Sequence, residues 1–146
     1  MKSSKARLVI ILSGGLFLLL DQFLKWQAAH LWSKPVLLLP YFGWQPYLNR
    51  GAAFSLPVSN LVVALFTAPM ICLVAYLSYR NYKKNILPAL LGWSLVLAGA
   101  ISNLVDRIFY GHVIDYFLVS TGIINIGDVL IVGGLIIFLF RIGKRT

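Results

Sequence analysis

All four acidic residues of the chain are aspartates, and each lies within or beside a run of apolar residues: Asp21, Asp106, Asp115 and Asp128. A carboxylate at membrane depth loses the solvation of its charge, so such residues are rare there and mark sites with a function. Two carboxylates that share a site tend to hold one proton between them, which provides a base to activate water and an acid to protonate a carbonyl group. The aspartates therefore indicate acid–base or proton-transfer chemistry in an apolar setting.

Two of these aspartates have basic residues at helical spacing. Asp21 and Lys25 are four residues apart, so they can pair on one face of a helix. Such a pair either takes part directly in function or neutralises itself inside a helix bundle. Asn103, Asp106 and Arg107 also share a helix face, where they can brace one another or bind the backbone of a substrate.

Asp115 and Asp128 have no basic partner at helical spacing, and the chain is expected to reverse direction between them. A loop could therefore bring one carboxylate back to the other. This spacing leaves two interpretations open, a dyad that activates water and a pathway for protons or ions.

Residues for other kinds of catalysis are scarce. Cys72 is the only cysteine and lies within an apolar run, so we expect a buried, unreactive thiol. His30 and His112 are too few and too scattered for a zinc site, and the sequence has no phosphate-binding glycine loop. We therefore predict no metal and no organic cofactor.

The composition indicates a membrane protein. Of the 146 residues, 60% are hydrophobic, and the mean hydropathy is +0.85, which exceeds what a soluble domain of this size can bury. A helix that spans a bilayer needs about 20 apolar residues. We place four such spans at residues 8–31, 60–79, 86–108 and 123–140, within a single integral membrane domain, residues 1–146.

The basic residues predict how this domain is oriented. Nine of them lie before the first span, between the second and third, or after the fourth: Lys2, Lys5, Arg7, Arg80, Lys83, Lys84, Arg141, Lys144 and Arg145. The positive-inside rule places these residues and both termini in the cytoplasm. All four aspartates then fall on the outer side. The net charge of +9 reflects this topology and contact with anionic lipid, and a nucleic-acid partner is not expected.

The outer connection, residues 32–59, is rich in aromatic residues and proline. Val36 to Leu39 could form a short strand followed by a turn. Aromatic side chains favour the membrane surface, so we expect a small sheet or cradle there, with a plain interfacial anchor as the alternative. Small residues in the third and fourth spans, among them Gly92, Gly99, Gly133 and Gly134, predict close helix packing.

Five short motifs occur in order along the chain: DQFLK at 21–25, NRGAAF at 49–54, GAISNLVDR at 99–107, VIDYF at 113–117 and NIGD at 125–128. With these motifs the chain resembles bacterial lipoprotein signal peptidase, or signal peptidase II, over essentially its full length. The resemblance implies an aspartyl endopeptidase of the bacterial inner membrane whose active site faces the periplasm, with Asp115 and Asp128 as the catalytic pair. The implied fold is an all-α protein of four transmembrane helices with cytoplasmic termini and a small β-like periplasmic segment between the first two.

The resemblance also implies the substrate, a prolipoprotein whose cysteine already carries diacylglycerol and which is cut immediately before that cysteine. We expect membrane lipid as a further partner, and a monomer. The residues expected to bind substrate or support the site are Asp21, Lys25, Asn49, Arg50, Gly51, Asn103, Asp106, Arg107 and Asn125.

Two residues depart from the usual pattern of this family. Ser102 stands where the family usually has glycine, and Gly127 stands where it usually has alanine. Both replacements are small, so we expect them to affect local helix packing and not the chemistry.

Two other classes of function are alternatives to a peptidase. A small proton-coupled carrier would also need intramembrane aspartates, but carriers typically have repeated halves and acids distributed across the membrane. A noncatalytic membrane scaffold would explain the small residues of the helices, yet it leaves the aspartates without a role.

Overall fold

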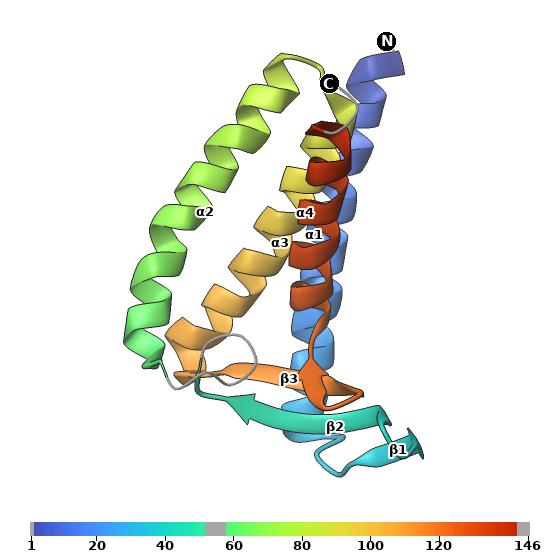
Figure 1. Ribbon diagram of the computed structural model, residues 1–146, viewed down its shortest axis with the longest axis vertical. Helices are drawn as coiled ribbons and strands as arrows, with labels where there is room; N and C mark the ends of the chain where they lie inside the picture. The colour runs from blue at the N-terminus through green and yellow to red at the C-terminus, as the bar shows by residue number, and fades with distance from the viewer. Residues whose placement is uncertain (1, 52–57, 143–146) are drawn as a thin grey trace.

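The computed structural model describes residues 2–51 and 58–142. The four helices of the described residues pack side by side, and a small sheet lies across one end of them (Figure 1). The helices are α1 (Lys2–His30), α2 (Asn60–Lys83), α3 (Leu87–Tyr110) and α4 (Ile126–Ile142). The strands are β1 (Val36–Leu39), β2 (Phe42–Asn49), β3 (Val113–Val119) and β4 (Gly122–Ile124). Residues 52–54 of the NRGAAF motif, and Lys144 and Arg145, lie outside the described residues.

Three of the described helices, α1, α2 and α3, are long and apolar enough to cross a membrane, and α4 is a shorter apolar helix of 17 residues. The prediction that a fourth span begins at residue 123 was wrong, because Ile123 and Ile124 pair with β3 as part of β4. A continuous apolar run does not distinguish a strand from a helix by its periodicity. Asp128 consequently lies in the first turn of α4, nearer the end of the helix than expected.

The sheet is antiparallel with the strand order β1-β2-β3-β4. Its first half comes from the segment predicted to form it, and the strand expected at Val36–Leu39 is confirmed. Its second half, β3 and β4, follows α3 and was not predicted. The chain is therefore mostly helical, with a sheet to which the connection between α1 and α2 and the connection between α3 and α4 both contribute.

The pairing of β2 with β3 determines what lies beside Asp115. Tyr47 is opposite Asp115 and Asn49 is opposite Val113 in this pairing. Because alternate residues of a strand point to the same face, Asn49 and Asp115 can meet on one side of the sheet. The other side of β3 carries Tyr116, which packs with Ala28 of α1 and thereby attaches the sheet to the end of that helix.

Helices α3 and α4 approach each other closely because two pairs of glycines face one another. A Cβ atom on Gly92 would lie 2.7 Å from the Gly134 carbonyl oxygen, and one on Gly99 would overlap the backbone of Gly127. The predicted close packing of these helices is thus confirmed, except that Gly133 faces open space. The contact holds Asn103 of α3 beside the beginning of α4.

The surfaces of α1 and α2 remain largely apolar and exposed. Cys72 of α2 was expected to be buried, but it is exposed on this surface. The prediction failed because α2 packs mainly against α3 and leaves its other faces uncovered. An apolar sequence environment does not distinguish a side chain inside the bundle from one on its outer surface.

Candidate active site

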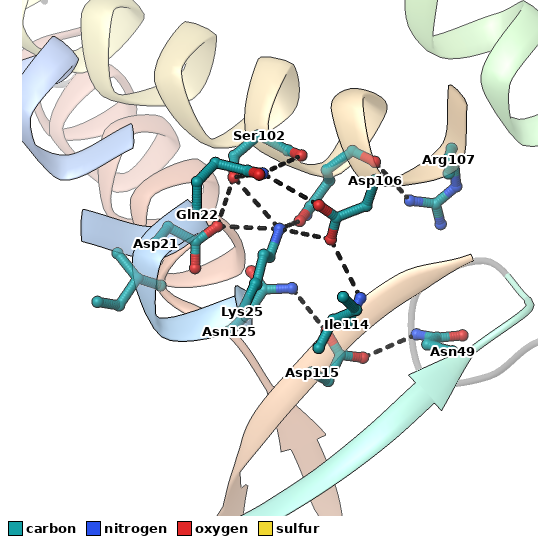
Figure 2. Close-up of polar contacts among 12 residues, drawn as sticks. Asp21, Gln22, Lys25, Asn49, Ser102, Asp106, Arg107, Ile114, Asp115 and Asn125 are labelled. Carbon is teal, nitrogen blue, oxygen red and sulfur yellow. Dashed lines mark hydrogen bonds and ion pairs between the residues drawn. The ribbon is translucent and has the colours of Figure 1, made fainter. Parts of the chain in front are cut away.

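Lys25 lies between two aspartates at the end of the helices nearest the sheet (Figure 2). Its Nζ atom is 3.0 Å from Asp21 Oδ2 and 3.0 Å from Asp106 Oδ2, and all three side chains are buried. The same Nζ donates a hydrogen bond of 2.8 Å to Asn103 Oδ1. The predicted pairing of Asp21 with Lys25 is therefore confirmed, and the contact of Lys25 with Asp106 joins α1 to α3. We call Asp21, Lys25 and Asp106 the lysine brace.

The expectation that Asp106 would have Arg107 as its basic neighbour was wrong. Asp106 pairs with Lys25, whereas Arg107 donates to the carbonyl oxygens of Gly51 at 3.0 Å and Asn103 at 3.4 Å. Consecutive residues of a helix point about 100° apart, so a neighbour in sequence is a poor partner for a buried carboxylate. Arg107 instead joins α3 to the segment that follows β2.

Three further side chains complete the contacts of the lysine brace. Tyr116 Oη donates to Asp21 Oδ1 at 2.7 Å, and Ser102 Oγ donates to Asp21 Oδ2 at 2.6 Å. Gln22 Nε2 donates to Asp106 Oδ1 at 3.0 Å. The backbone N–H of Ile114 donates to Asp106 Oδ2, 3.1 Å away, which ties the brace to β3. Every carboxylate oxygen of the brace thus has a partner.

Asp115 and Asp128 lie on either side of Asn125, the residue that precedes α4. Asn125 Nδ2 donates to Asp115 Oδ1 at 2.6 Å. Asn125 Oδ1 accepts from the backbone N–H of Asp128 at 2.9 Å, while Asp128 Oδ2 accepts from the backbone N–H of Asn125 at 3.2 Å. One asparagine therefore connects both of the aspartates that lack a basic partner at helical spacing.

The remaining oxygens of these two carboxylates also accept from amides. Asn49 Nδ2 lies 3.0 Å from Asp115 Oδ2, and Asn103 Nδ2 lies 2.9 Å from Asp128 Oδ1. Among the described residues, no basic side chain comes within 4.0 Å of either carboxylate. Amides can orient a carboxylate but cannot neutralise its charge. We call Asp115, Asn125 and Asp128 the asparagine bridge.

The surroundings of Asp115 favour its protonated form. Burial raises the pKa of Asp115 to about 7, and the negative charge of Asp128 acts in the same direction. The hydrogen bonds from Asn49 and Asn125, and the charge of Lys25, oppose this rise in pKa only in part. Asp115 can therefore gain or lose a proton near neutral pH, as general acid–base catalysis requires.

Tyr116 remains a proton donor under all ordinary conditions. Burial raises the pKa of its hydroxyl, and the negative charge of Asp21 raises it further. Its hydroxyl also accepts a hydrogen bond of 3.1 Å from the backbone N–H of Ile126, the first residue of α4. Tyr116 thereby joins the lysine brace to the beginning of the helix that carries Asp128.

The structure brings nearly all of the predicted site residues together. Asn49, Asn103 and Asn125 contact the carboxylates, while Gly51 donates its N–H to Asn49 Oδ1 at 3.1 Å. Arg50 lies at the end of β2 with its side chain exposed. No group of three or more His, Cys, Asp and Glu side chains that could hold a metal occurs within residues 2–51 and 58–142.

Sequence reasoning missed two residues of the site, Gln22 and Tyr116. Both are next to aspartates that it had selected, but adjacency alone gives no sign of a contact. For Tyr116 a signal existed, because a tyrosine next to Asp115 in an otherwise apolar run needs a buried partner for its hydroxyl. Ser102 was expected to affect only packing, yet its hydroxyl contacts Asp21, Lys25 and Gln22.

Comparison with known proteins gives consistent results. A family model described as signal peptidase (SPase) II matches residues 13–143. A lipoprotein signal peptidase of Serratia marcescens is 30% identical, over 90% of this chain and 84% of its own length. Another, from Brucella ovis, is 32% identical over 89% of this chain and 88% of its own.

Two solved structures have the same fold. Both are described as bacterial membrane enzymes, and each is 23% identical to this chain. One has a TM-score of 0.81 and matches 93% of this chain and 88% of its own. The other has a TM-score of 0.79 and matches 94% of each chain. The arrangement of helices and sheet is therefore that of a known membrane enzyme fold.

Proposed function

Because the chain belongs to the signal peptidase II family, a family of aspartic proteases, we propose that it removes the signal peptide from diacylglyceryl-modified prolipoproteins by cutting just before the lipidated cysteine. The observation that supports this most strongly is the asparagine bridge, in which Asn125 holds Asp115 and Asp128 with no cation within 4.0 Å among the described residues. Two such carboxylates favour sharing one proton. That state is the one in which an aspartic protease begins its reaction.

The proposed reaction uses water and forms no covalent intermediate with the enzyme. Ionised Asp128 takes a proton from a water molecule, whose oxygen attacks the carbonyl carbon of the scissile peptide bond. Protonated Asp115 donates its proton to the carbonyl oxygen, which gives a neutral tetrahedral intermediate. As the C–N bond breaks, Asp128 passes its proton to the leaving amine and Asp115 recovers one from a hydroxyl of the intermediate.

The roles of the two aspartates follow from their positions. Asp115 lies on β3, where its burial raises its pKa to about 7 and favours the acid form. Asp128 lies in the first turn of α4, where it accepts from the backbone N–H of Asn125 at 3.2 Å and where the helix dipole favours a negative charge. We therefore assign the starting proton to Asp115 and the activation of water to Asp128.

A groove beside the site provides a place for the apolar part of the signal peptide. Helices α2, α3 and α4 enclose about 530 Å³, lined almost entirely by apolar side chains that include Val62, Trp93 and Leu135. Near the outer end of this groove Asn60 Nδ2 donates to the Arg107 carbonyl oxygen at 3.2 Å. A peptide lying in the groove would thus leave it close to the residues proposed to position the scissile bond, Asn49 and Arg107 among them.

The membrane topology is also part of the proposal. Helix α1 begins, and α2 ends, at the same end of the bundle, while the sheet lies at the opposite end (Figure 1). The basic residues of the first end favour the cytoplasm, so the sheet and the site would face the periplasm. The whole chain would form one peptidase domain of four membrane helices, including the shorter α4, and would act as a monomer in the bacterial inner membrane.

The sheet would lie on the outer surface of the membrane. Its edge exposes Leu38 and Leu39 of β1 and Tyr41 in the turn that follows. Aromatic and aliphatic side chains of this kind favour the headgroup zone. Contact with lipid there would keep the site level with the end of a signal peptide, next to the cysteine whose acyl chains remain in the bilayer.

The direct test is cleavage of a purified prolipoprotein, with and without its diacylglyceryl group, by this protein in detergent or nanodiscs. We expect cleavage of the modified substrate only, with mass spectrometry giving a product that begins at the lipidated cysteine. Equal cleavage of both substrates, or cleavage at another bond, would overturn the proposed specificity. Proton flux in liposomes without any cleavage would favour the carrier instead.

A further inference from the structure

Ser102 and Gly127 meet at the same carboxylate oxygen although they lie on different helices. We propose that Ser102 and Gly127 are a matched pair that fixes Asp21 and, through Tyr116, positions Asn125 between Asp115 and Asp128. This inference rests on the proposed function, because it assigns positioning roles for the same reaction.

The Ser102 hydroxyl is fully buried and has three partners. It donates to Asp21 Oδ2 at 2.6 Å, and it accepts from Lys25 Nζ at 3.2 Å and from Gln22 Nε2 at 2.9 Å. Asp21 Oδ2 is therefore held between a hydroxyl of α3 and the ammonium group of Lys25. Without the hydroxyl this oxygen would keep Lys25 but would be free to move towards the space that Ser102 Oγ now fills.

Gly127 leaves room for three side-chain oxygens, one from each neighbouring part of the site. A Cβ atom at this position would lie 2.9 Å from Asn125 Oδ1, 3.1 Å from Asp21 Oδ2 and 3.2 Å from Asn103 Oδ1. Ordinary van der Waals contact for a Cβ begins at 3.4 Å. An alanine at this position would therefore displace the asparagine of the bridge, the aspartate of the brace, or both.

Tyr116 and Asn125 connect Asp21 to the reacting carboxylates, so a displacement of Asp21 changes their surroundings. Asp21 Oδ1 accepts from Tyr116 Oη at 2.7 Å, and Tyr116 Oη accepts from the N–H of Ile126 at 3.1 Å. Ile126 follows Asn125 directly in the chain, so the position of its backbone nitrogen restricts the position of Asn125. Asn125 in turn donates to Asp115 at 2.6 Å.

The geometry therefore couples the two residues with a definite sign. With Ser102 present, its hydroxyl restricts Asp21 Oδ2 on one side while an alanine at 127 would press on the same oxygen. With the hydroxyl removed, Asp21 has room to shift, whereas Asn125 Oδ1 at 2.9 Å must still give way to the methyl group. The loss of the hydroxyl and the gain of the methyl group should therefore compensate each other in part, as residues that share a partner often do.

The test is a double-mutant cycle of Ser102→Ala, Gly127→Ala and the double variant, with kcat, KM and Tm measured for each. We expect Gly127→Ala to lower kcat about tenfold with KM nearly unchanged, because the substrate groove is untouched. Ser102→Ala should lower kcat about threefold, and the double variant should lose clearly less than the roughly 30-fold product of the two single losses. The loss of Tm in the double variant should likewise be smaller than the sum of the two single losses.

Two matched controls isolate the pair. Gly133→Ala places a methyl group on α4 where no atom lies within 4 Å, and Ser94→Ala removes a buried hydroxyl on α3 about two turns before Ser102. Both should leave kcat unchanged. Losses that simply multiply in the double variant, in kcat and in Tm alike, would overturn the coupling. If wild type cleaved no prolipoprotein, the proposed function would fail, and compensation in Tm would still decide whether the pair is coupled.

Discussion

The lysine brace and the asparagine bridge each contain two aspartates, but different groups lie between them. In the brace, Lys25 contacts Asp21 and Asp106 through its charged Nζ atom. In the bridge, Asn125 contacts Asp115 and Asp128 through a neutral amide and its own backbone N–H. A cation compensates buried negative charge, whereas an amide only orients it, so the bridge requires a proton. The central residue, more than the carboxylates, therefore decides whether a pair of aspartates stabilises the fold or carries out the reaction.

The largest effect should come from removing the cation of the brace. Lys25→Met would leave Asp21 and Asp106 buried without compensation, and breaking a buried pair in this way costs about 3–5 kcal/mol. We expect a large fall in Tm in detergent, together with loss of activity. Lys34→Met, which removes an exposed lysine, serves as the control, and equal stability of the two variants would contradict the role assigned to Lys25.

Removing the bridge should affect the reaction more than the fold. Asn125→Ala takes away the amide that holds Asp115, and we expect kcat to fall about 100-fold, a typical loss for one preorganised donor. The fall in Tm should be much smaller than for Lys25→Met. Asn81→Ala, at the far end of α2, removes a side-chain amide that donates to the Leu77 carbonyl oxygen at 2.7 Å. A kcat for Asn125→Ala close to that of this control would show that the bridge has no part in the reaction.

The pH dependence of the rate should reveal the proton of the bridge. Asp115 acts as an acid in the proposed reaction, and its pKa is raised to about 7. The rate should therefore fall as the pH rises above about 7, by roughly tenfold per unit at the alkaline limit. Steady-state cleavage between pH 5 and 9 measures this directly. A rate that instead rises through pH 7 would assign the role of base to Asp115.

The smallest expected effect is on stability. Folding raises the pKa of Asp115 from its ordinary value of 3.8 to about 7, so between these values the folded protein binds a proton that the unfolded chain releases. The stability that this bound proton contributes is therefore lost as the pH rises through about 7. Asp115→Asn removes this penalty, and its Tm should exceed that of wild type by roughly a few degrees at pH 8 and by less at pH 5. Equal Tm differences at both pH values would contradict the raised pKa.

Much of the fold could be predicted from sequence because long apolar runs and short aromatic segments follow from the membrane environment. The prediction of secondary structure failed at Ile123 and Ile124. Its residues are as apolar as those of α4, and only their pairing with β3 makes them a strand. A contact between distant segments of this kind leaves no periodicity in the local sequence.

The site could be predicted only in part, because its residues come from different helices and strands. Spacing along one helix identified the pairing of Asp21 with Lys25, but it could not show that Lys25 also reaches Asp106 on another helix. The family motifs selected Asn125, whereas its position between Asp115 and Asp128 depends on where α4 begins. Contacts within one helical turn can be read from sequence, and contacts between elements cannot.

The claim that the lysine brace stabilises the fold while the asparagine bridge carries out the reaction is tested most directly by comparing four variants. Prolipoprotein cleavage and Tm are measured for Asp21→Asn, Asp106→Asn, Asp115→Asn and Asp128→Asn. We predict that the Asp115 and Asp128 variants stay folded and lose cleavage. The Asp21 and Asp106 variants should lose stability but retain cleavage in the fraction that is folded, with kcat reduced for Asp21→Asn because Asp21 positions Asn125 through Tyr116. Cleavage at the wild-type rate by folded Asp115→Asn or Asp128→Asn protein would contradict the account.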